Sequence, residues 1–133
     1  MLKESITYTD FNGLERTEDF YFNLTKNELV KMETSKDGSL SAKLTRIVNA
    51  KDAHDIIAAL DSIMLKAYGE KSSDGRRFVK SEEISNAFSQ TPAYDSLFDK
   101  MLSDTDYAVK FVKGILPADL ASQIDEKNLS VNI

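Results

Sequence analysis

The sequence contains no cysteine and a single histidine, His54. The absence of cysteine excludes disulfides, thiolate metal sites and cysteine nucleophiles. One histidine cannot form a multi-histidine metal site, and a catalytic triad would require it beside a serine and an acid in space. His54 falls near the start of a predicted helix, where a solvated or capping histidine is the commoner role. The sequence therefore predicts no metal, no cofactor and no enzyme activity.

Long apolar runs and an excess of positive charge are also missing. No stretch approaches the roughly 20 apolar residues of a membrane-spanning helix, and the opening residues lack the apolar segment of a signal peptide. The 17 basic and 22 acidic residues give a formal net charge of −5. This charge disfavours polyanionic partners such as nucleic acids and anionic membranes. We therefore expect a soluble, cytosolic protein whose partner is basic or apolar.

The first residues predict an antiparallel β-hairpin over residues 3 to 24. Asn12-Gly13 indicates a two-residue turn, in which both residues take positive φ. A lone two-stranded ribbon is marginally stable in water, so its apolar face needs helices or another chain to pack against. Apolar positions alternate with polar ones on both strands: Ile6 and Tyr8 on the first, Phe20, Phe22 and Leu24 on the second.

After Leu24 the apolar spacing becomes helical. Thr25 and Glu28 fit a reciprocal capping box. The strongest helical pattern runs from about 52 to 68, and Gly69 is the residue that ends it. One buried face of this helix is predicted at Ile56, Leu60, Ile63, Met64 and Ala67. Other helix signals are an apolar stripe (Leu40, Leu44, Ile47, Val48), a cap at Ser81, a cap at Thr91-Pro92, and a helix from about Thr105 that ends at Gly114. The predicted fold is α+β, with the N-terminal antiparallel β-hairpin packed on a mostly α-helical bundle.

At 133 residues the chain is long enough to form one domain with its own core. We expect a single domain over residues 1–133, with the hairpin at about 3–24 and the helical region at about 25–117. The tail, residues 118–133, has a weak amphipathic pattern. This pattern predicts a last short helix followed by a frayed end.

The segment "AYGEKSSDGRRFVKSEE", residues 67 to 83, stands out as basic in an acidic chain. A phosphate-binding loop is a poor fit, because Gly69 and Gly75 are spaced one residue too far apart and Gly75 is followed by Arg76 instead of lysine. Turn and cap residues explain most positions as an ordered connection between two helices. In that interpretation Ser73, Asp74 and Gly75 turn the chain.

Within this connection we predict a partner-binding surface at Arg76, Arg77 and Phe78. An arginine fork pairs with carboxylates and stacks on aromatic faces, and Phe78 would anchor the loop. The alternative is that both arginines pair with acids of the same domain, such as Glu70, Glu82 or Glu83. Exposed ion pairs of that kind contribute only about 0 to 1 kcal/mol.

Neighbouring acids give no enzyme signature. Carboxylates are favoured electrostatically in the first turn of a helix, which accounts for the pairs Glu82/Glu83 and Asp104/Asp106. The pair Asp95/Asp99 is typical of a solvated helix face. The segment "SDTDYAVKFVKG" lacks the central glycine and final glutamate of a calcium loop. The pairs considered for general acid–base chemistry are Glu82 and Glu83, Asp95 and Asp99, and Asp104 and Asp106.

Three stretches resemble a family of small proteins of tailed bacteriophages, the tail assembly chaperones. They are "ITYTDFNGLERTEDFYFNLTKNEL" (6–29), "IMLKAYGEKSSDGRRFVKS" (63–81) and "FSQTPAYDSLFDKMLSDTDYAVKFVKGILP" (88–117). The resemblance implies a non-enzymatic protein without a cofactor that binds the phage tape measure protein and helps to recruit tail tube subunits. It also implies a location in the host cytoplasm and absence from the mature virion.

An alternative function is a structural tail or neck component that is retained in the virion through strand addition at the hairpin. Neither nucleic acid nor membrane is expected as a partner in either case. The sequence leaves open whether the chain forms a homo-oligomer.

Overall fold

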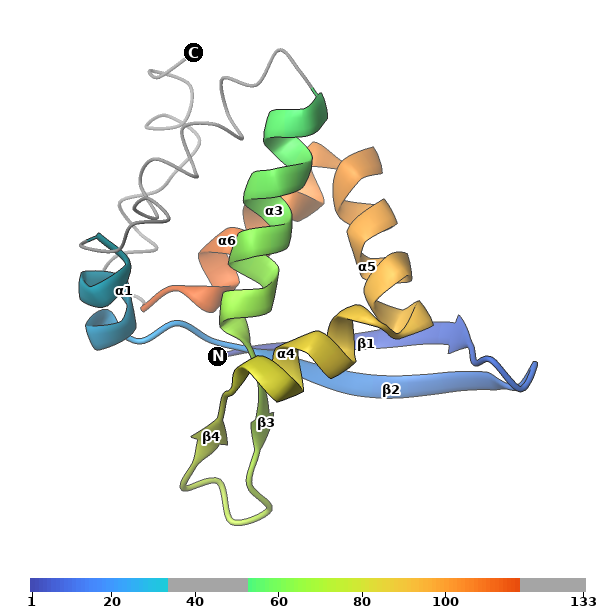
Figure 1. Ribbon diagram of the computed structural model, residues 1–133, viewed down its shortest axis with the longest axis horizontal. Coiled ribbons are helices and arrows are strands. Elements are labelled where there is room, and N and C mark those ends of the chain that lie inside the picture. The colour runs from blue at the N-terminus through green and yellow to red at the C-terminus, as the bar shows by residue number, and fades with distance from the viewer. Residues whose placement is uncertain (34–52, 118–133) are drawn as a thin grey trace.

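The computed structural model describes residues 1–33 and 53–117. Within these ranges the chain forms an α+β fold, as predicted (Figure 1). The apolar stripe at 40–48, the tail at 118–133 and the side chain of His54 lie outside what is described. The elements in chain order are β1 (Leu2–Thr9), β2 (Glu15–Phe22), α1 (Lys26–Glu33), α3 (Ala53–Ala67), β3 (Tyr68–Lys71), β4 (Phe78–Val79), α4 (Glu82–Ser89), α5 (Pro92–Ser103) and α6 (Thr105–Ile115).

The N-terminal hairpin is confirmed, but its predicted turn is wrong. Strands β1 and β2 pair antiparallel from Leu2↔Phe22 to Thr9↔Glu15. The Asp10 N–H donates to the Leu14 carbonyl at 2.8 Å, so the loop contains three residues instead of two. Only Gly13 takes a positive φ, 82°. The Asp10 carboxylate accepts from the Asn12 and Leu14 N–H groups, both at 2.9 Å, and this stabilises the longer turn.

Helix starts were predicted well because capping depends on local chemistry. The Thr25 hydroxyl accepts from the Glu28 N–H at 3.1 Å, and the Glu28 carboxylate accepts from the Thr25 N–H at 2.9 Å. This is the predicted capping box. Ser81 and Thr91 cap α4 and α5 through the Ile84 and Tyr94 N–H groups, and Asp104 caps α6 through the Tyr107 N–H.

One four-stranded antiparallel sheet, in the order β1-β2-β3-β4, carries the core. Helices α3, α5 and α6 lie on one side of the β1–β2 ribbon (Figure 1). Phe22 and Ile63 are fully buried, and the Tyr68 and Phe88 rings stack with centroids 4.1 Å apart. The predicted buried face of α3 is confirmed at Leu60, Ile63, Met64 and Ala67, whereas the side chain of Ile56 lies outside what is described.

Two glycines differ from their predicted roles as helix ends. Gly69 does not end α3 in a loop, because β3 begins at Tyr68 directly after Ala67. Gly114 lies inside α6, which continues to Ile115. A Cβ at Gly114 would lie 2.9 Å from the Leu2 side chain, so the residue has a packing role between α6 and β1.

The predicted connection between two helices is ordered and turns at Ser73 to Gly75. Its strands were not predicted: residues 68–79 form a second hairpin that adds β3 and β4 to the sheet. Among the described residues, no helix is both long enough and apolar enough to cross a membrane.

Candidate partner-binding surface on the second hairpin

The second hairpin is built on the end of α3. Strand β3 pairs with β2 through Tyr21↔Gly69 and Phe22↔Tyr68. Gly69 is required by close packing, since a Cβ there would lie 2.8 Å from Cε2 of the Phe78 ring and 2.9 Å from the carbonyl oxygen of Val79. The missing side chain therefore allows β4 to lie close against β3.

Lys80, which directly follows β4, joins the base of this hairpin to the start of α1. Its Nζ donates to the Asn23 carbonyl oxygen at 2.5 Å and to the Glu28 carboxylate at 2.6 Å. Burial alone would raise the pKa of Glu28, but the hydrogen bonds from Lys80 and Thr25 outweigh it and lower that pKa. The capping carboxylate of α1 is thus held ionised and serves both the helix and the hairpin.

The basic tip of the hairpin, residues 72–77, is an ordered turn. The Ser72 N–H donates to the Arg77 carbonyl at 2.8 Å, and Gly75 takes a φ of 75°. The Asp74 carboxylate accepts from the Ser72 hydroxyl at 2.6 Å and from the Arg76 N–H at 3.0 Å. These two hydrogen bonds, in that order, lower the pKa of Asp74. Side chains of the turn therefore fix the backbone that carries both arginines.

Arg76 and Arg77 are exposed, and within the described part of the chain neither forms an ion pair. The predicted alternative, internal pairing with acids such as Glu70 or Glu82, is therefore not seen among these residues. Phe78 is half-buried on β4 with its ring against Gly69, 5.7 Å from the Lys80 ammonium. Of the three predicted binding residues, two form the exposed tip and the third supports it.

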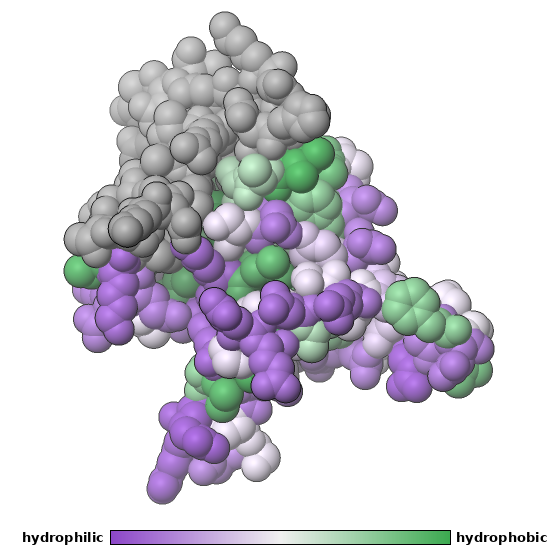
Figure 2. All heavy atoms as spheres, in the orientation of Figure 1, coloured by the Kyte–Doolittle hydropathy of each residue, from purple (hydrophilic) through white to green (hydrophobic). Residues whose placement is uncertain are grey.

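The charge of the hairpin is opposite to that of the whole protein. The projecting tip is hydrophilic, with apolar atoms nearer the body (Figure 2). A positive surface presented on an acidic protein favours a partner with carboxylates, which arginine binds through two parallel hydrogen bonds. Residues 68–80 contain four basic side chains, Lys71, Arg76, Arg77 and Lys80, against two acidic ones, Glu70 and Asp74.

Among the described residues, no group of three histidine, aspartate or glutamate side chains is placed to hold a metal ion. Sequence reasoning missed the structural roles of Gly69 and Lys80. The hairpin itself had a signal, because Asp74-Gly75 is a common hairpin dipeptide. Lys80 had none, since its partners Asn23 and Glu28 are distant in the sequence.

Comparison with known proteins supports the resemblance described above. Residues 1–132 match the profile of a family described as phage tail assembly chaperone. Neither a curated protein nor a solved structure matches the chain. The family match covers all residues but the last, so this chain belongs to the phage tail assembly chaperone family.

Proposed function

We propose that this chaperone binds the tape measure protein of its phage in the host cytoplasm and helps to recruit tail tube subunits around it. The proposed contact is the basic tip, with Arg76 and Arg77 reaching carboxylates of the partner and Phe78 supporting them. Membership of the chaperone family supports an assembly role. The basic tip carries the proposal, because both arginines are exposed and free of ion pairs to described residues.

The tip suits this task for two physical reasons. Its backbone is already ordered by Ser72 and Asp74, so binding costs less conformational entropy than closing a flexible loop would. The acidic remainder of the chain keeps a complex with a long apolar client soluble and repels nucleic acid. No step in this role requires a covalent reaction or a cofactor.

The test is the double variant Arg76→Ala plus Arg77→Ala, co-expressed with the tape measure protein of the same phage. We expect unchanged thermal stability and strongly reduced co-purification. Lys110→Ala, at an exposed position on α6, removes one positive charge elsewhere and is the charge control for each single change, Arg76→Ala or Arg77→Ala, measured beside the double variant. Undiminished co-purification of the double variant would remove these arginines from the contact. Failure of the wild-type chain to co-purify would contradict tape measure binding itself.

A second candidate function is a structural tail or neck component that stays in the particle. It is favoured by strand β1, which lies at the edge of the sheet and has no strand beside its outer edge among the described residues, as strand addition requires. Mass spectrometry of purified virions separates the two functions. We expect the chain to be abundant in infected cells and missing from purified virions, whereas stoichiometric copies in the virion would favour the structural component.

A further inference from the structure

Strand β1 has an edge with no neighbouring strand in the described sheet. The bond from the Asp10 N–H to the Leu14 carbonyl fixes the phase of the β1–β2 ladder, because bonded and non-bonded pairs alternate along an antiparallel pair. Tyr8, Ile6 and the other even-numbered residues of β1 therefore point their backbone groups at β2. The outward-facing backbone groups belong to Lys3, Ser5, Thr7 and Thr9.

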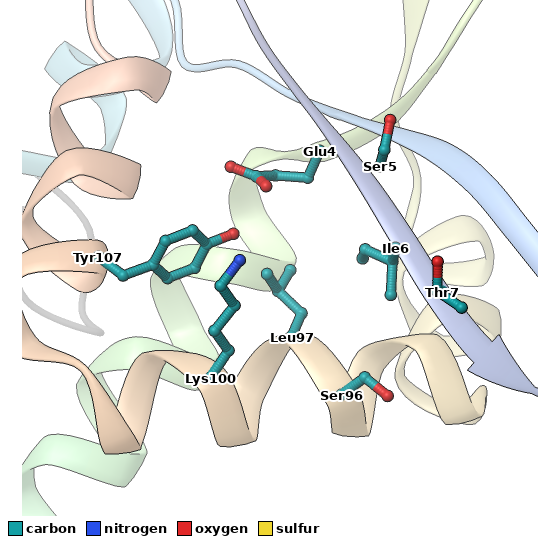
Figure 3. Close-up of a pocket in the computed structure, with 8 residues that line it drawn as sticks. All are labelled: Glu4, Ser5, Ile6, Thr7, Ser96, Leu97, Lys100 and Tyr107. Carbon is teal, nitrogen blue, oxygen red and sulfur yellow. The ribbon is translucent and has the colours of Figure 1, made fainter.

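A cavity of about 240 Å³ lies beside this edge, between β1 and α5. The side chains of Ile6 and Leu97 point into the space between the two elements (Figure 3). Both are buried in the core, with 8% and 2% of their surface exposed, so they form an apolar floor. Helix α5 thus forms one wall of a groove whose other wall is a row of unpaired peptide groups.

One end of the groove is charged. Glu4, Lys100 and Tyr107 point toward one another there (Figure 3). The Lys100 ammonium lies 4.2 Å from the centroid of the Tyr107 ring, and the Tyr107 hydroxyl is hydrogen-bonded to Glu4. Lys100 is exposed and forms no ion pair with any residue that the structure describes. Its charge is therefore available to an acidic group entering the groove.

We propose that this groove binds an extended segment of a phage tail protein as a fifth strand of the sheet, with an acidic side chain of that segment directed at Lys100. The segment would pair its backbone with Ser5 and Thr7, and its inward-facing side chains would enter the cavity above Ile6 and Leu97. The proposal goes beyond the contact at the basic tip, because it concerns the edge of β1 and specifies the side chains that the bound segment carries.

The edge lacks most of the features that normally block strand addition. Proteins protect an exposed edge with proline, with several charged residues, with a bulge or with a very short strand. Strand β1 has eight residues, no proline and a paired register without interruption. Its outward-facing positions are serine and threonine, apart from Lys3 at one end. Main-chain pairing would supply affinity, and the floor and Lys100 would select the side chains.

The test uses overlapping synthetic peptides that cover the tape measure and tail tube proteins of the same phage. In the free chain, amide hydrogen exchange should be fast at Ser5 and Thr7 and slow at Ile6. A peptide that binds the groove should slow exchange at Ser5 and Thr7. Thr7→Pro removes one outward N–H, whereas Thr7→Val keeps that N–H and loses only the hydroxyl contact with Thr17. We expect about tenfold weaker peptide binding by Thr7→Pro than by Thr7→Val.

A second variant tests the charge at the groove. Lys100→Glu should weaken a peptide with an acidic residue more than Lys100→Gln does. The proposal is overturned if no peptide protects Ser5 and Thr7, or if their protection appears without peptide and grows with protein concentration, which would make a second copy the occupant. Retained co-purification with the tape measure protein alongside unprotected amides would overturn the strand site and leave the proposed function standing.

Discussion

The Lys80 ammonium and the Glu28 carboxylate are 52 positions apart in the sequence and form an ion pair of 2.6 Å. This pair joins the end of the second hairpin to the first turn of α1. The hairpin is therefore held from two directions, through β2 by strand pairing and through α1 by the lysine. The basic tip projects from a base that is fixed on both sides.

Replacement of Lys80 by methionine should lower the free energy of unfolding by about 1 kcal/mol near neutral pH, because both partners are only partly buried. The folded-state pKa of Glu28 is lowered, so its stabilising contribution exists above its ordinary pKa of 4.5 and is lost as the pH falls through the folded-state value. The difference between wild type and Lys80→Met should therefore shrink in acid. Urea unfolding at several pH values measures it, with Lys110→Met as the control.

Gly69→Ala should destabilise the fold by about 1 to 3 kcal/mol, because the new methyl group would collide with the Phe78 ring and the Val79 carbonyl oxygen. Thermal unfolding tests this. Adding Phe78→Leu should restore only part of the loss, since the backbone contact remains, and Phe78→Leu alone is the control. Wild-type stability in Gly69→Ala would show that β4 does not lie this close to β3.

Asp74→Ala should leave the stability of the core unchanged and disorder the basic tip. The carboxylate accepts from the Ser72 hydroxyl and the Arg76 N–H, and alanine leaves both without this partner. We expect faster amide exchange at Arg76 and reduced co-purification with the tape measure protein. Asp74→Asn keeps the accepting oxygen and is the matched control. Equal exchange at Arg76 in the wild type and Asp74→Ala would contradict this account.

Tyr94→Phe should reduce the free energy of unfolding by about 1 kcal/mol near neutral pH. The variant should then lose less stability than the wild type as the pH rises. The Tyr94 hydroxyl donates to Asp61, and burial followed by this hydrogen bond raises the pKa of Tyr94. A raised folded-state pKa means that the contribution is complete below the ordinary value of 10 and is lost as the pH rises toward the folded-state value. The difference in melting temperature between wild type and Tyr94→Phe should therefore be smaller at about pH 11 than at about pH 8. A constant difference would place the effect elsewhere.

Local chemistry accounts for what the sequence could predict. The caps at Thr25, Ser81 and Thr91 depend on a few adjacent residues, and the buried face of α3 depends on spacing within one helix. For the second hairpin, Asp74-Gly75 is a local signal for the turn only. Its pairing depends on β2, which lies far away in the chain, and its short strands have no alternating pattern of their own. For the same reason a binding surface at Arg76 and Arg77 could be predicted, but the contacts of Lys80 with Asn23 and Glu28 could not.

Helix α3 continues directly into β3 without a loop, so the orientation of the second hairpin is coupled to that of α3. No loop residue separates Ala67 from Tyr68, so only the ends of the two elements could absorb a change in φ and ψ. Tyr68 stacks on Phe88 and pairs with Phe22, so both rings brace the point where helix becomes strand. A force applied to the tip would therefore act on the contacts that Tyr68 makes with Phe88 and Phe22. If a partner binds the tip as proposed, a force on that partner would act on the packing of Tyr68 and Phe88 in the core.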